Sequence, residues 1–233
     1  MAVTRKPPRE QYREQVRQEA KRLAWEQIAT AGASALSVNA IAKRMAMSGP
    51  ALYRYFTNRD ALITELIRDA YWSLAEAFRS AASTGTDLAG LAHVLRDWAL
   101  EDPHRYLLVY GTPVPGYHAP DDVTEAASEI MSTLLDACTA TDPATNTAFA
   151  EHLEHHRQWM RGHPAPSTAA HRALTFWTAL HGVLSLELAG HFKGMGFDPA
   201  LLFTAELDRL LDRGEAAAPR AQSACTANHS HSE

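Results

Sequence analysis

The chain has few cysteines and no long apolar run. Only Cys138 and Cys225 are present, far apart and without neighbours at the spacing of a metal site, so neither a disulfide framework nor a zinc motif is expected. No segment approaches the roughly 18 uncharged apolar residues of a membrane span. The N-terminus is rich in Arg, Lys and Pro and lacks the apolar core of a signal peptide. These absences predict a soluble protein of a reducing compartment, and we expect the cytoplasm.

The chain also lacks the short motifs of common enzymes. It contains no Gly-rich phosphate loop, no nucleophile elbow and no paired carboxylate constellation. We therefore expect neither catalysis nor a bound cofactor. A helical enzyme and a helical protein–protein adaptor without DNA-binding activity remain alternatives.

Positive charge is confined to one end of the chain. Residues 1–68 contain 12 Lys or Arg and 6 Asp or Glu, a net charge of +6, whereas residues 69–233 contain 10 and 21, a net charge of −11. The overall charge of −5 and pI near 6.2 conceal this division. A basic head on an acidic body restricts attraction for a polyanion such as DNA to the head.

The segment Ser37–Phe56 (SVNAIAKRMAMSGPALYRYF) predicts two short helices joined by a tight turn. The first helix is expected over 38–45 after an N-cap at Ser37, the turn over 46–48, and the second helix over 49–55. Small residues at the start of the second helix allow close approach to a groove floor, and basic residues on its flanks can hold phosphates. This is the pattern of a helix-turn-helix that enters a DNA major groove.

Helical periodicity continues through the rest of the chain, and no segment alternates as a strand does. An all-α fold is therefore predicted. Residues 1–10 are expected to be a disordered basic arm, because Pro7 and Pro8 deter a helix, and residues 214–233 a disordered tail. The other expected helices are 12–31, one from Thr57 or Asn58 to about 80, 87–101, 103–111, 122–138, 146–159, 168–192 and 199–213.

Residues 12–66 resemble the tetracycline-repressor (TetR/AcrR) family of one-component regulators. The matching residues are Gly32, Ala35-Leu36-Ser37-Val38, Ile41-Ala42, Ser48, Leu52-Tyr53-Arg54-Tyr55-Phe56 and Asn58-Arg59-Asp60-Ala61-Leu62. The resemblance implies a three-helix DNA-binding head over 11–66 and a helical ligand-binding and dimerisation domain over 67–213, linked by the fourth helix. Trp177, His181 and Gly182 resemble a subgroup whose regulatory domain carries a Trp–His–Gly signature.

The resemblance implies a ligand-responsive repressor. It would bind a near-palindromic operator as a homodimer and be released by an unidentified small molecule. Two positions depart from the family pattern: Ala46 stands where the turn usually has Gly, and Gly49 has no side chain where some members read a base. The DNA-binding residues so expected are Ser37, Asn39, Lys43, Arg44, Ser48, Gly49, Pro50, Ala51, Tyr53, Arg54, Tyr55, Asn58 and Arg59.

The body offers candidates for a ligand site and a dimer interface. An inducer pocket in a helical bundle is expected to be apolar with a few polar groups. The ligand candidates are Trp98, Tyr106, Tyr110, Phe149, Trp159, Trp177 and His181, although packing in the core explains each of them as well. The dimer candidates are Leu180, Val183, Leu184, Leu188, Leu207 and Leu210, which can instead bury against their own subunit.

Histidines cluster at His152, His155 and His156 on a predicted helix. Two imidazoles on one helix face can hold a metal ion, whereas a solvated helix rich in His and Glu requires none. No metal is assigned from the sequence.

Overall fold

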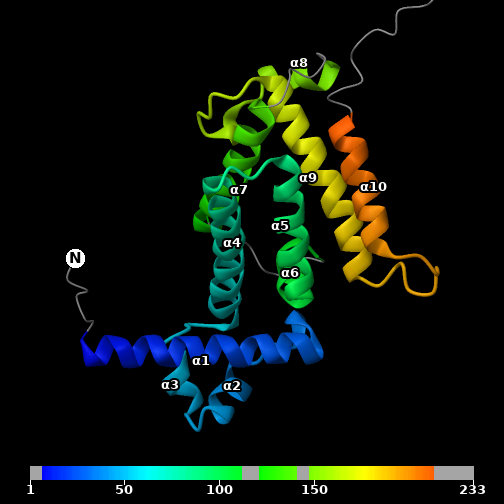
Figure 1. Ribbon diagram of the computed structural model, residues 1–233. Coiled ribbons are helices and arrows are strands. Elements are labelled where there is room, and N and C mark those ends of the chain that lie inside the picture. Colours follow the sequence, from blue (N-terminus) through cyan, green and yellow to red (C-terminus); the bar gives the residue numbers. More distant parts are fainter. Residues whose placement is uncertain (1–6, 112–120, 141–146, 213–233) are drawn as a thin grey trace, which may run out of the picture.

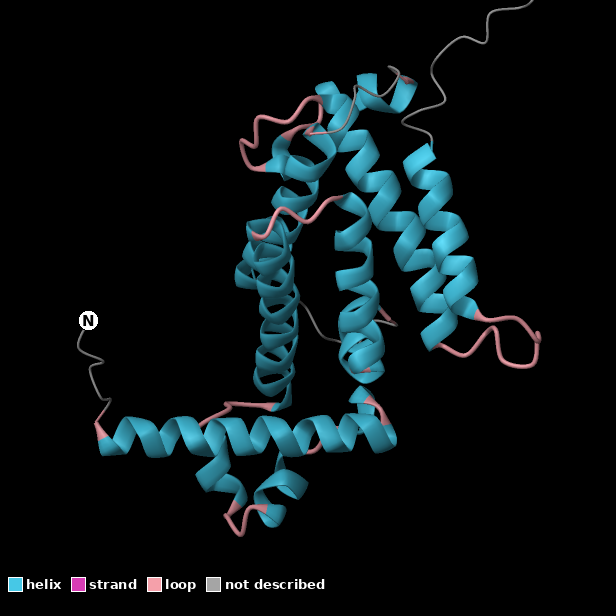
Figure 2. Ribbon diagram, in the orientation of Figure 1, coloured by secondary structure: helices cyan, strands magenta, loops and turns pink. Residues whose placement is uncertain are grey.

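The computed structural model describes residues 7–111, 121–140 and 147–212, and every regular element within these ranges is a helix (Figures 1 and 2). The predicted all-α fold is confirmed. No helix in the described ranges is long and apolar enough to cross a membrane. The elements are α1 (Pro8–Ala31), η1 (Ala33–Ala35), α2 (Val38–Arg44), α3 (Gly49–Tyr53), α4 (Arg59–Ser83), α5 (Leu88–Glu101), α6 (Pro103–Tyr110), α7 (Asp121–Thr139), α8 (Ala148–Glu154), η2 (Gln158–Met160), α9 (Ser167–Leu188) and α10 (Pro199–Asp212).

Three predicted helices have an end that differs by four residues or more from the structure. Helix α1 begins at Pro8 rather than near residue 12, since proline fits the first helical position without losing a hydrogen bond. The predicted helix over 146–159 ends at Glu154, and Arg157 then binds the carbonyl oxygens of His163 and Ala165, which holds the chain in a non-helical path. Helix α9 ends at Leu188, shortly before Gly190 at φ 81°. The predicted tail, residues 214–233, and residues 1–6 of the predicted arm lie outside the described residues.

Side-chain caps fix the helix-turn-helix locally. The Ser37 hydroxyl accepts a hydrogen bond from the Ala40 amide, and the Ser48 hydroxyl accepts one from Ala51. Asn58, rather than Thr57, caps α4 by accepting from the Ala61 amide at 2.7 Å. Each cap satisfies an N–H group that the helix itself leaves unpaired.

The turn between α2 and α3 contains a strained residue. Ala46 has φ 53°, a left-handed conformation that costs a residue with a Cβ about 1–2 kcal/mol. Ala46→Gly is therefore expected to raise the free energy of unfolding by up to about 1 kcal/mol, after the larger entropy of the unfolded glycine chain is deducted. Chemical denaturation of the two proteins measures the difference. A lower stability of the glycine variant would contradict this account of the turn.

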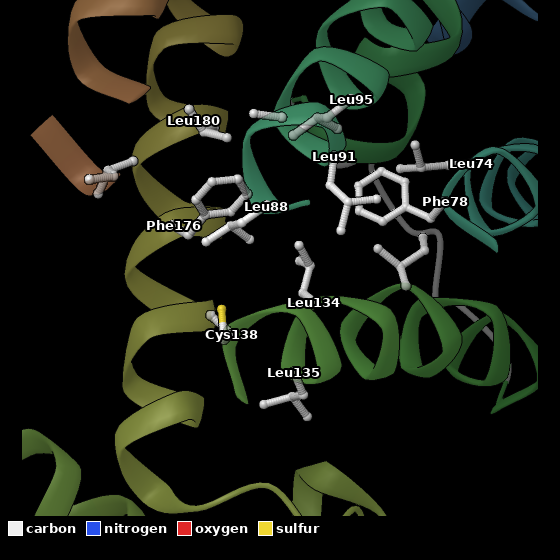
Figure 3. Packing of buried hydrophobic residues seen from close by; sticks show 14 of the residues in the cluster. Leu74, Phe78, Leu88, Leu91, Leu95, Leu134, Leu135, Cys138, Phe176 and Leu180 are labelled. Carbon is white, nitrogen blue, oxygen red and sulfur yellow. The ribbon is translucent and has the colours of Figure 1, made fainter. Parts of the chain in front are cut away.

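The molecule has two hydrophobic cores that meet on α4. The head core combines α1, α2 and α3 with Leu62, Ile63, Leu66 and Ile67 of α4. The body core begins at Ala70 on the same helix. Figure 3 shows part of the body core, in which side chains of α4, α5, α7 and α9 interdigitate. Helix α4 is therefore shared by both units, and the predicted boundary at residues 66 and 67 lies beside the change of core.

Ion pairs fix α4 against α1, which lies across its lower end in Figure 1. Arg17 pairs with Glu65, and its guanidinium also donates to the Tyr55 carbonyl at 2.9 Å. One turn along, the buried Lys21 binds Asp69 at 2.6 Å. The head is thus held to the first half of α4 by charge as well as by apolar packing, and a movement of α4 carries the head with it.

Candidate DNA-binding surface and ligand site

Helix α3 presents a polar face to solvent and an apolar face to the head core. Leu52 is fully buried, while Pro50, Tyr53 and Arg54 are exposed. Figure 1 shows α2 and α3 on the side of α1 that faces away from the body. A short exposed helix at the end of a basic head has the geometry required to enter a major groove.

Two basic side chains flank this face without an ion-pair partner among the described residues. Lys43 lies at the exposed end of α2, and Arg54 follows α3 directly. Asn39, also exposed, lies against the start of α3, where a Cβ on Gly49 would come within 2.5 Å of its side-chain oxygen. Gly49 thus makes room for Asn39, a contact that the sequence alone does not indicate.

Other predicted DNA contacts are engaged within the head. Arg44 binds Glu26 at 2.5 Å, and the Arg59 guanidinium donates to the Ala33 carbonyl at 2.7 Å. Tyr55 is half-buried against the head core with the Arg13 guanidinium 6.0 Å from its ring centre. In this structure these three side chains brace the head, and their expected contacts with DNA stay predictions. The remaining predicted residues, Ser37, Ser48, Ala51 and Asn58, lie at the exposed or half-exposed starts of α2, α3 and α4.

Four predicted ligand residues meet where α6 packs against α9. The Tyr110 and His181 ring centres are 4.3 Å apart, and the Trp177 ring centre lies 4.1 Å from that of His181. Tyr106 stacks on His181 with ring centres 5.5 Å apart. Tyr71 of α4 completes the group with its edge toward Tyr110. We call these five residues the aromatic cluster.

The other three ligand candidates lie outside the aromatic cluster. Trp98 contacts Tyr106, but its indole N–H donates to Ser73 and Arg105 covers its face at 4.4 Å, so its position is fixed by packing. Phe149 on α8 is 45% exposed and touches His152 and His171. Trp159 lines a separate hollow of about 400 Å³ between α7 and η2. The sequence-based set therefore divides among four places: the aromatic cluster, the adjoining Trp98, the exposed Phe149 and the hollow at Trp159.

The predicted histidine group does not form a metal centre in the described part of the chain. His152 and His156 stack with ring centres 4.1 Å apart. The Nδ1 atoms of His155 and His156 lie within hydrogen-bond distance of the backbone carbonyls of Glu151 and His152. These contacts lie at the end of α8, and no third potential ligand stands beside the pair within the described ranges.

Hydrogen bonds organise the polar edge of the aromatic cluster. The Tyr106 hydroxyl lies 2.8 Å from His181 Nδ1 and 2.9 Å from the Ser185 hydroxyl. Burial lowers the pKa of His181 to about 4, and burial raises the pKa of Tyr106 to about 12. Both side chains are therefore uncharged at neutral pH. Sequence reasoning missed Ser185 and Tyr71; the one available signal was that Ser185 lies one turn after His181.

The low pKa of His181 makes the stability of the protein depend on pH. An unfolded histidine binds its proton near pH 6.5, whereas folded His181 does so only near pH 4. The neutral, buried His181 therefore adds about 3 kcal/mol to the free energy of unfolding above pH 6.5, and this stabilisation is lost as the pH falls toward 4. We expect His181→Asn, which keeps an acceptor for Tyr106, to lose this part of the pH dependence in denaturant titrations from pH 7 to 4. Parallel pH profiles for the two proteins would contradict the burial of a neutral imidazole.

The predicted dimer residues lie mostly inside their own subunit. Leu180, Leu184, Leu207 and Leu210 are buried in the body core, and Figure 3 shows Leu180 among the core side chains. Val183 and Leu188 are partly buried against that core. The leucine periodicity identified the inward faces of α9 and α10. The apolar side chains exposed on the other faces are Leu186, Leu201 and Leu202.

Comparison with known proteins agrees with this arrangement. Residues 22–66 match the family described as bacterial regulatory proteins of the tetR family, and residues 88–210 match the tetracyclin repressor-like C-terminal domain. The HTH-type transcriptional regulators Rv1816 of Mycobacterium tuberculosis H37Rv and Mb1846 of Mycobacterium bovis are each 34% identical over 211 residues, which cover 83% of this chain and 90% of theirs.

Two solved structures are also similar to this chain. The crystal structure of the protein SCO4313 is 69% identical, with a TM-score of 0.83 over 88% of this chain and 99% of that one. A protein of unknown function from Rhodococcus sp. RHA1 shares the fold at 22% identity, with a TM-score of 0.63 over 84% of this chain and 93% of that one. The Trp–His–Gly subgroup stays a prediction. The chain belongs to the TetR family of bacterial helix-turn-helix transcriptional regulators, which bind DNA and are not enzymes.

Proposed function

We propose that this regulator is a cytoplasmic repressor that binds a near-palindromic operator as a homodimer and leaves it when a small molecule binds the body. The observation that carries the proposal is the exposed face of α3. Tyr53 and Arg54 project from it into solvent, beside Lys43, which has no ion-pair partner in the described part of the chain, on a head of net charge +6. A two-fold dimer would place two such helices in successive major grooves, roughly one helical turn apart.

The exposed faces of α9 and α10 are the proposed dimer surface. Leu186 is 45% exposed and Leu201 69% exposed, and Gly182 on α9 has open space where a Cβ would point. In Figure 1 these two helices lie side by side on the flank of the body away from α4. Two such pairs can form a four-helix interface whose apolar residues are covered only in the dimer.

Leu201→Asp on this surface is expected to weaken the dimer at least 10-fold, because each subunit then buries an unpaired carboxylate. Sedimentation velocity over a concentration series measures the change. Leu100→Asp on α5, where the leucine is 41% exposed, is the matched control and should leave the dimer unchanged. If both variants weaken the dimer equally, or if neither weakens it, the dimer surface lies elsewhere.

Helix α6 is the proposed link between ligand and head. Tyr106 and Tyr110 on α6 belong to the aromatic cluster, whereas Leu108 on the same helix packs against the head core. A ligand that moves α6 would therefore shift α1 and α4, which the Arg17–Glu65 and Lys21–Asp69 pairs join. The two heads of a dimer can lie closer together or farther apart. The ligand changes DNA affinity only if it binds the protein more tightly at one of these spacings than at the other.

Footprinting on DNA upstream of its own coding sequence tests the proposal. The purified protein should protect one near-palindromic site, with two subunits bound per site. Protection of a single half-site by one subunit would overturn the dimeric repressor, and uniform protection without a preferred site would overturn sequence-specific binding.

A further inference from the structure

Two buried polar atoms of the aromatic cluster have no hydrogen-bond partner among the described residues. They are the Tyr110 hydroxyl and His181 Nε2. A buried polar group left unpaired costs about 1–3 kcal/mol, so two of them on side chains in direct ring contact require an explanation. Tyr110, Trp177 and His181 are each partly exposed as residues, whereas the Tyr110 hydroxyl and His181 Nε2 are themselves buried, so a ligand reaches these two atoms only when the cluster opens.

The hydrogen bonds around Tyr106 determine whether Nε2 of His181 is a donor or an acceptor. The Ser185 hydroxyl contacts only Tyr106, at 2.9 Å, among the described residues, so we assign its proton to Tyr106. We assign the Tyr106 proton to the 2.8 Å contact with His181 Nδ1 rather than to the 3.4 Å contact with the His181 carbonyl. An uncharged imidazole that accepts at Nδ1 carries its proton on Nε2. The unpaired Nε2–H is therefore a donor, and the neutral phenol of Tyr110 supplies a second one.

The surroundings of both donors are uncharged. Tyr110 contacts the rings of Tyr71, Tyr106, Trp177 and His181, and His181 contacts the rings of Tyr106, Tyr110 and Trp177. Within the described ranges, no hydrogen bond joins either side chain to a charged group. A carboxylate ligand would find no cation among the described residues here to offset its desolvation. An ammonium ligand would find ring faces but would meet two donors where it needs acceptors.

We propose that the effector is an uncharged, largely apolar molecule whose carbonyl oxygen accepts hydrogen bonds from the Tyr110 hydroxyl and His181 Nε2–H. This inference rests on the proposed ligand response and assigns its chemistry. The carbonyl oxygen has two lone pairs and can take both donors, while the rings of Trp177 and Tyr71 pack on the apolar part of the molecule. Tyr106 and Ser185 act as positioning residues, since they fix which nitrogen of His181 carries the proton.

Four matched naphthalene probes test the proposal on the whole chain by calorimetric titration. They are acetylnaphthalene, the hydrocarbon ethylnaphthalene, the carboxylate naphthoate and the primary ammonium naphthylmethylammonium. The ketone should bind at least about 10-fold more tightly than either charged probe. Tyr110→Phe should weaken the ketone by about 2- to 10-fold without weakening the hydrocarbon, because it removes one hydrogen bond and no apolar surface.

Tyr12→Phe is the matched control, since this exposed tyrosine lies in the head far from the cluster. It should leave every probe unchanged. Removing the unpaired Tyr110 hydroxyl should not lower the melting temperature, so the Tyr110→Phe result is not obscured by misfolding. Equal affinity for a charged probe, equal weakening of ketone and hydrocarbon, or no saturable ketone binding would each overturn the proposal.

Operator binding is measured separately on the same protein. Failure of ketone binding with intact operator binding overturns the effector chemistry and leaves the repressor proposal standing. Ketone binding without any operator binding overturns the repressor proposal and leaves the effector chemistry standing.

Discussion

Lys43→Glu combined with Arg54→Glu is expected to lower operator affinity on the order of 10³-fold at about 0.1 M salt. Both side chains are exposed beside α3 and have no ion-pair partner in the described structure. A dimer presents four such charges, and each phosphate contact contributes about 0.9 to the exponent of the salt dependence. At about 0.1 M salt the logarithm of the salt concentration is about −1, so losing four contacts lowers the logarithm of the association constant by about 3.6. Fluorescence anisotropy with labelled operator DNA measures the change.

The matched control is a second variant with two charge reversals in the body instead of the head. Arg161→Glu with Lys193→Glu changes one exposed arginine and one exposed lysine outside the head. It alters the net charge equally, so it should lower affinity far less than the head variant. Equal losses for the two variants would show that net charge, rather than the face of α3, determines binding.

Glu187→Gln is expected to lower the free energy of unfolding by about 3–5 kcal/mol. Glu187 on α9 receives two hydrogen bonds from Arg96 on α5, at 2.7 and 2.9 Å, and the two side chains are 15% and 10% exposed. Arg96 also covers the ring of the buried Phe203 on α10 at 4.9 Å. Removing the carboxylate charge leaves a guanidinium uncompensated in the middle of three helices. Denaturant unfolding measures the loss.

The paired change Arg96→Met with Glu187→Leu separates the cost of an unpaired charge from the value of the pair. Replacing both partners with apolar residues of similar size should restore most of the lost stability. If the double variant is as unstable as Glu187→Gln, the pair itself, rather than the uncompensated arginine, stabilises the contact between α5, α9 and α10.

The head could be predicted closely because its signals are local. The cap at Ser37 and the turn over 46–48 act within a few residues, and the sequence pattern predicts both. Ser48 is predicted only as part of that turn, and its role as a cap is seen only in the structure. The partners of its arginines could not be predicted. Arg44 meets Glu26 from 18 residues away and Arg59 meets a carbonyl 26 residues away, and only the packing of α1 against α2 and α4 brings them together.

The body was predictable as helices but not as sites. Periodicity shows that Leu180 and Leu184 share a helix face, but it does not say whether that face meets its own subunit or a partner. The structure buries both in the body core. The aromatic residues posed the same difficulty. Tyr110 and His181 are brought together by the packing of α6 on α9, whereas Phe149, an equal candidate from the sequence, is left 45% exposed on α8.

The most direct test of the account is the salt dependence of binding to the DNA upstream of the protein's own coding sequence. A dimer that holds phosphates through Lys43 and Arg54 alone makes four contacts, so the logarithm of the association constant should fall linearly with log salt with a slope of about −3.6 or steeper. The Lys43→Glu and Arg54→Glu variant should reduce that slope by about the same amount. A shallow slope, or no saturable binding at about 0.1 M salt, would contradict a DNA-gripping head.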